Sequence, residues 1–178
     1  MTDQELLNLA AECGFSHVNM LNVPALEFRS EVRDMCSADK CNHYGRCWIC
    51  PPHCGTLEEV AEKAQKYSRG ILVQCTGQME DDYDVETMLE TGAEQKKCFA
   101  KLVKAVREAY PNCLPMSAGH CTVCPTCTCP DAPCRFPELA IPSMEAYGLW
   151  VSKVCEDSGA KYYYGPQTIT YTSCILVD

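Results

Sequence analysis

Cysteine density constrains this chain more than any other feature. The chain has 16 cysteines in 178 residues, and ten of them fall into two short segments. The first segment holds Cys36, Cys41, Cys47, Cys50 and Cys54, and the second holds Cys121, Cys124, Cys127, Cys129 and Cys134. Cysteines two residues apart in one loop are better placed to converge on a metal than to form strain-free disulfides. The spacing therefore predicts two metal-binding loops, at about residues 36–54 and 119–137.

The compartment expected from the sequence agrees with metal binding. The N-terminus, from Met1 to Leu7, is charged and opens an amphipathic segment, so no signal peptide is predicted. We expect a cytoplasmic protein, because thiols in a reducing compartment are held for metals or catalysis more often than for disulfides. No apolar run approaches the ~20 residues of a membrane span, so we expect no membrane association.

The charge balance restricts the partners. Fifteen Lys and Arg residues against 24 Asp and Glu residues leave a net charge of −9, and no stretch concentrates the basic residues. We therefore expect no nucleic-acid partner. Iron–sulfur clusters held by thiolates would make the protein still more negative, so a redox partner protein is expected to dock through a basic surface. No oligomeric state is predicted.

Helical and strand patterns alternate along the chain. Helices are expected at about residues 6–13, 25–35, 56–67, 85–110 and 143–157, and strands at about 16–23, 71–75 and 113–116, with two further strands around a turn in the tail from residue 161 to 177. This order predicts an α+β or α/β fold in a single compact domain over residues 1–178, with a small mixed sheet, flanking helices and the two cysteine loops. Single cysteines on apolar faces are expected in the core, at positions 13, 75, 98, 155 and 174.

The second cysteine loop has the more regular spacing. Cys121, Cys124 and Cys127 follow one another at intervals of three, which lets one loop wrap three corners of a cubane while a fourth thiolate comes from farther away. A tetrahedral zinc usually takes two separated cysteine pairs, and the zinc-ribbon spacing is absent. The loop therefore predicts a [4Fe–4S] cluster on these three cysteines and Cys134, with Cys129 as a spare or alternative ligand and a structural zinc as the alternative metal.

The first cysteine loop is less regular, so zinc is a stronger alternative there. Cys47 and Cys50 form the one pair with ferredoxin-like spacing and a following proline. The ligands predicted for a second [4Fe–4S] cluster are Cys36, Cys41, Cys47 and Cys50. Cys54, His43 and His53 lie close in sequence, so more donors are present than four ligand positions need.

Several motifs resemble a known family. They are YGRCWICPP at residues 44–52, PDAPCRFP at 130–137, SMEAYG at 143–148 and YYGP at 163–166. Together they resemble the predicted metal-binding proteins catalogued as domain of unknown function 2284, across nearly the whole chain. That family is known chiefly from prokaryotes, many of them anaerobes, and is described as metal-binding rather than by a reaction.

The resemblance also implies ligands. It supports Cys36, Cys41 and Cys50 in the first site, and Cys121, Cys124, Cys127 and Cys134 in the second. The positions of Cys47 and Cys129 are often not cysteine in relatives, so a first cluster held by three cysteines is the alternative.

The expected function depends on the fourth ligand of the first site. A cluster with four thiolates only stores or passes electrons or stiffens the fold, whereas three thiolates leave one iron free to act as a Lewis acid. We expect an electron-transfer or redox-accessory protein with two [4Fe–4S] clusters in anaerobic-type metabolism. One alternative is an iron–sulfur enzyme that binds a small anionic or sulfur-containing substrate, with acid, base or anchoring groups from His43, His53, Tyr44 or Arg46. The other is a zinc-stabilised interaction module. No catalytic residue is assigned.

Overall fold

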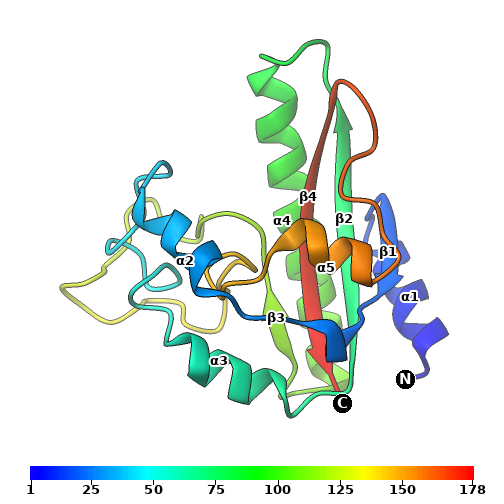
Figure 1. The fold of residues 1–178 in the computed structure, drawn as a ribbon, viewed down its shortest axis with the longest axis horizontal. Helices are drawn as coiled ribbons and strands as arrows, with labels where there is room; N and C mark the ends of the chain where they lie inside the picture. Colours follow the sequence, from blue (N-terminus) through cyan, green and yellow to red (C-terminus); the bar gives the residue numbers. More distant parts are fainter.

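A four-stranded antiparallel sheet forms the centre of the computed structural model, which describes residues 1–178. The strands are β1 (His17–Met20), β2 (Arg69–Gln78), β3 (Leu114–Met116) and β4 (Thr168–Val177), in the order β1-β2-β4-β3. The two central strands, β2 and β4, pair along their full ten-residue length, from Arg69 opposite Val177 to Gln78 opposite Thr168. Figure 1 shows these two long strands side by side, with the shorter strands at the edges.

Five α-helices surround the sheet. They are α1 (Asp3–Glu12), α2 (Ser30–Ser37), α3 (Leu57–Ala64), α4 (Val85–Ala109) and α5 (Val151–Asp157), and a short 3₁₀ helix, η1, covers Val23–Ala25. Capping boxes begin two of the helices, with Thr2 and Glu5 at α1 and Thr56 and Glu59 at α3. None of the helices is both long enough and apolar enough to cross a lipid bilayer.

The sheet buries apolar side chains on both faces, because neighbouring residues of a strand point to opposite sides. Ile71 and Val73 of β2 pack against α1 and α4, where Phe99 and Leu102 contribute to the same core. On the other face, Leu72 packs with residues of α3, α5 and the segment before α5. The single cysteines expected in the core are buried in these two clusters, at positions 13, 75, 98, 155 and 174.

The α+β fold is confirmed, with two corrections to the expected sheet. The pairs of named strands are all antiparallel, so the sheet is not mixed, and the parallel pairing is an isolated bridge between Ser117 and Ser143. The tail contributes one strand instead of two. Residues 161–164 do not form the other, and they are bound instead by a buried side chain: Gln74 Nε2 donates to the Lys161 carbonyl, and the Tyr164 hydroxyl donates to Gln74 Oε1.

Two predicted helices are shorter than expected. The helix predicted at 25–35 is displaced, since α2 begins at Ser30 and residues 23–25 form η1. The helix predicted from residue 143 begins only at Val151. Gly148 interrupts it, because this residue has a φ of +82°, which lies outside the helical region.

Gly148 also fixes the chain that enters the first cysteine loop. The Arg29 amide donates to the Gly148 carbonyl at 2.8 Å, and Phe28 forms a bridge with Leu149. A β-carbon on Gly148 would lie 2.8 Å from the Arg29 carbonyl oxygen and 2.7 Å from Leu57 Cδ2. Only glycine fits this close approach.

Replacing Gly148 by alanine should therefore lower the free energy of unfolding by about 2–4 kcal/mol, from backbone strain and overpacking together. The measurement is urea unfolding under anaerobic conditions, followed by far-ultraviolet circular dichroism. Gly159→Ala is the matched control, because Gly159 has a φ of +68° and a β-carbon there would meet no heavy atom within 4 Å. The free energy of unfolding of Gly159→Ala should fall by only about 1 kcal/mol. Equal losses in the two variants would contradict the role given to the Arg29 contact.

Candidate metal centre

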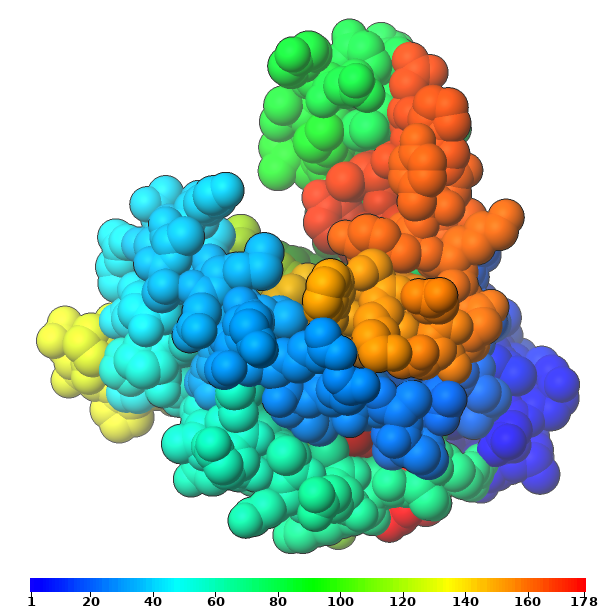
Figure 2. Space-filling view, in the orientation of Figure 1, coloured from blue at the N-terminus to red at the C-terminus, as the bar shows by residue number.

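The two cysteine loops contact each other and form one lobe, here called the cysteine lobe and defined as residues 36–54 and 119–137. Trp48 Nε1 donates to the Ala132 carbonyl at 3.1 Å, across 84 positions of sequence. The rings of His43 and His120 stack with centroids 4.1 Å apart and an interplanar angle of 15°. Figure 1 shows the loops, cyan and yellow, side by side, and Figure 2 shows them projecting together from one side of the molecule.

Secondary structure holds the ends of both loops. α2 carries Cys36 in its last turn, and α3 begins three residues after Cys54. The second loop follows β3, and the segment after it enters the core through the buried Met144. The loops are thus anchored at their ends to the sheet and its helices.

All five thiols of the first loop are neighbours. Cys36 lies close to Cys41 and Cys54, and Cys50 lies close to the same two residues and contacts Cys47. Burial raises the pKa of the Cys36 and Cys50 thiols, and the neighbouring thiols raise it further. A bound metal cation would offset both effects, because it stabilises the thiolate.

Arg33 is a site residue that the sequence reasoning missed. Its Nη2 donates to Cys54 Sγ at 3.1 Å and also to the Gly55 carbonyl. Cys54 Sγ in turn donates to the Ala146 carbonyl at 3.5 Å. Burial raises the pKa of the Cys54 thiol, and the guanidinium of Arg33 opposes that rise. The available signal was the spacing, since Arg33 and Cys36 lie three residues apart on one helix and so share a face.

The second loop places its thiols around a cavity of about 740 Å³. Five cysteines of this loop line it together with Cys47 of the first loop; they are Cys121, Cys124, Cys127, Cys129 and Cys134. Burial alone would raise the pKa of the Cys127 thiol. The backbone amides of Cys129 and Trp48 lie against its sulfur, and they outweigh burial and lower the pKa. A lowered pKa favours the thiolate, which is the form that binds metal.

Cys47 lies between the two groups of thiols. Its side chain is 2% exposed, and it contacts Cys50 of its own loop and Cys127 of the other. Cys121 and Cys129 of the second loop are also close to it. The residue that the spacing assigned to the first site is therefore placed to serve either one.

All eight predicted ligands lie in the cysteine lobe. One group contains Cys36, Cys41 and Cys50. The other contains Cys121, Cys124 and Cys127, and Cys134 lines the cavity of that second group. Cys47 lies between the two groups. No three Cys, His, Asp or Glu side chains converge tightly enough to hold a single metal ion.

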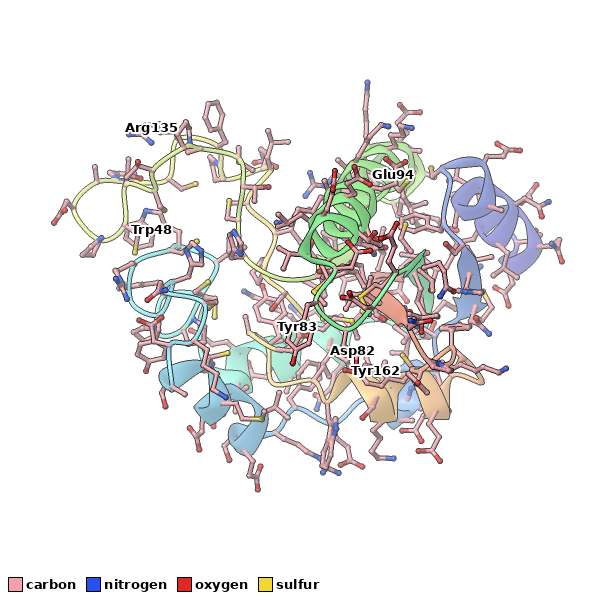
Figure 3. The ribbon with its side chains drawn as sticks, turned by 90° about the horizontal axis from the view of Figure 1, so that it is seen from above. Trp48, Asp82, Tyr83, Glu94, Arg135 and Tyr162 are labelled. Atoms are coloured by element: carbon pink, nitrogen blue, oxygen red, sulfur yellow. The ribbon has the colours of Figure 1, made fainter.

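Of the four residues considered as acid, base or anchor, three have side-chain partners within the protein. His53 packs edge-on against Trp48 with ring centroids 5.2 Å apart, and His43 stacks on His120. Arg46 forms an ion pair with Asp39. Tyr44 is exposed on the surface. Figure 3 shows Trp48 and Arg135 on the two loops at the same side of the molecule, apart from the sheet.

Comparison with known proteins gives a family. The model of the predicted metal-binding proteins DUF2284 matches residues 19–177, a range that contains both cysteine loops and all four strands except the first two residues of β1. No curated protein and no solved structure matches the chain. With a match over nearly its whole length and sixteen cysteines, the chain belongs to the DUF2284 family of predicted metal-binding proteins.

Proposed function

We propose that the protein carries electrons through two [4Fe–4S] clusters, one on each group of thiols in the cysteine lobe. The observation that carries the proposal is the contact between the loops, which gathers ten cysteines into one lobe with Cys47 touching both groups. Two clusters built there would be neighbours. Neighbouring centres suit a protein that accepts an electron at one cluster and passes it through the other.

The donor set fits iron–sulfur clusters better than zinc. A tetrahedral zinc with bonds of about 2.3 Å needs four sulfurs within about 4 Å of one another. No three Cys, His, Asp or Glu side chains lie close enough together to hold a single metal ion. A cubane is larger than one ion and takes its thiolates at four separate corners, so it fits a wider set of soft sulfur donors.

The contacts allow a change in the ligand sets inferred from spacing. Cys54 is a neighbour of Cys36 and Cys50, so it is placed to complete the first set with Cys41. Cys47 would then complete the second set with Cys121, Cys124 and Cys127, in place of Cys134. Each cluster would then have four thiolates and no open iron, as an electron carrier requires.

The proposed partner is a redox protein with a basic docking surface. The chain has a net charge of −9, and each cluster held by four thiolates would add negative charge. Opposite charge speeds the encounter of redox partners and orients them. We place this exchange in the reducing cytoplasm of a prokaryote with an oxygen-poor metabolism, where thiolate-bound clusters persist.

Protein prepared without oxygen should be brown and contain about eight irons and eight acid-labile sulfides per chain, because two cubanes hold that number. Iron, sulfide and zinc analysis of the same sample is the measurement. Stoichiometric zinc without labile sulfide would refute the clusters and support a zinc-stabilised module.

Alanine at Cys124 or Cys127 should remove one cluster, with loss of about four irons and retention of the rest. The domain should also become less stable, because metal binding and folding are coupled. Cys113→Ala is the matched control, since Cys113 lies outside the cysteine lobe, and it should keep the full iron content. Full iron in both loop variants would show that these two thiols are not ligands.

Pairs of substitutions test the assignment of Cys47 and Cys54. If Cys47 serves the second cluster, the Cys47→Ala, Cys127→Ala double variant should keep about four irons, as each single variant does, because both changes affect one cluster. The Cys54→Ala, Cys127→Ala pair should lose nearly all the iron. Nearly complete loss of iron in the Cys47→Ala, Cys127→Ala variant, with about four irons kept in the Cys54→Ala, Cys127→Ala variant, would assign Cys47 to the first cluster.

A further inference from the structure

A second cavity, of about 570 Å³, lies between α4 and the two ends of the second cysteine loop. Its helical wall is one face of α4, since the residues follow a spacing of three and four: Lys96, Phe99, Ala100, Val103, Lys104 and Arg107. The opposite wall consists of residues 120–123 together with Glu138, Leu139 and Ile141. Figure 3 shows the helix and the loop, green and yellow, on the two sides of this region.

The charge around this cavity is opposite to that of the whole chain. Lys96, Lys104 and Arg107 line it with a single carboxylate, Glu138, although the chain carries a net charge of −9. None of the three cations forms a salt bridge. Three unneutralised cations on one wall attract an anion.

Backbone carbonyls hold two of these cations in place. Lys96 Nζ donates to the His120 carbonyl at 2.9 Å, and Arg107 Nη1 donates to the Glu138 carbonyl at 2.8 Å. A neutral carbonyl orients a cation without cancelling its charge. Lys104 is exposed beside them and is free to bend toward a bound anion.

The floor of the cavity is apolar. Ile49, Phe99 and Val103 are 5%, 2% and 3% exposed, so their side chains are fixed by the surrounding core. Leu139 and Ile141 extend the apolar surface on the loop side. A cavity of several hundred Å³ with apolar walls and a few polar groups is the usual form of a small-molecule site.

We propose that this cavity binds a small carboxylate with an apolar body, its carboxylate held by Lys104 and its neighbouring cations and its body against Phe99 and Val103. The occupant would touch both ends of the second cysteine loop, including Cys121. Binding itself does not depend on the proposed clusters. Only the further step, that the bound carboxylate changes the reduction potential of the second cluster, rests on the proposed function.

Calorimetric titration of the anaerobically prepared protein with 4-phenylbutyrate tests the site. The neutral analogue 4-phenylbutyramide has the same body without the charge. We expect one saturable site for the carboxylate at millimolar concentration or below, and binding of the amide weakened about tenfold. Equal affinity for the two compounds, or no saturable binding of the carboxylate, would overturn the proposal.

Three variants locate the site. Ala100 is exposed on the cavity wall, so Ala100→Phe should fill the space and abolish binding without disturbing the core. Lys104→Gln should weaken carboxylate binding at least threefold and leave the amide unaffected. Lys101→Gln, an exposed neighbour outside the cavity, is the control and should bind as the parent does. Unchanged affinity in Ala100→Phe, with unchanged circular dichroism, would exclude this cavity.

Iron and sulfide analysis of the same samples separates the two proposals. Absence of binding in a protein with eight irons would overturn the cavity alone. Saturable, charge-dependent binding in a protein without iron would overturn the clusters and leave the cavity standing.

Discussion

The ten-residue pairing of β2 with β4 is the constraint on which the rest of the structure depends. Its register sends alternate side chains into two separate cores, one under α1 and α4 and the other under α3, α5 and the segment around Met144. The elements that anchor the cysteine loops pack on these cores: α3 after the first loop, β3 before the second and residues 143–150 after it. The sheet thus holds the end of the first loop and both ends of the second, while the middle of each loop is held by contacts with the other loop.

Those contacts bring thiols into an environment where the thiolate form is unfavourable without a cation. Burial raises the pKa of Cys36, Cys50, Cys54 and Cys121, and neighbouring thiols raise it further. Each of these thiols therefore resists ionisation at neutral pH, and among the side chains described above only the guanidinium of Arg33 lies directly against one of them. A metal centre would supply the missing positive charge and displace the protons, so the loops and the metal would stabilise each other. Affinity for the metal would weaken as the pH falls, because protons compete for sulfurs whose pKa is raised.

The sequence was sufficient for the elements with a strong local pattern and insufficient for contacts between the loops. The helical spacing of α4 predicted nearly its whole length, and the apolar run at 71–75 predicted the central half of β2, because each pattern reports local burial. The start predicted at residue 143 for the helix that ends at Asp157 was wrong, because Gly148 needs a positive φ to approach Arg29, a tertiary requirement with no periodic signal. Cysteine spacing predicted the two loops, but it could not place Cys47 beside Cys127, since 80 positions separate them and no pattern in either loop encodes the other.

The two sets of cysteines in the lobe differ in the charges that surround them. This difference gives the proposed electron transfer between the clusters a direction. The first group has the Glu145 carboxylate near Cys36 and the Arg33 guanidinium against Cys54, which carry opposite charges. The second has Lys96 near Cys121 and backbone amides against Cys127, both of which favour added negative charge, whereas the Asp131 carboxylate near Cys129 opposes it. The reduction potential of a cluster rises with positive charge and with hydrogen bonds to its sulfurs. The second cluster would therefore be the better acceptor. A carboxylate bound in the adjacent cavity would partly neutralise Lys96 and lower that potential, so ligand binding and electron transfer would be coupled at this end of the lobe.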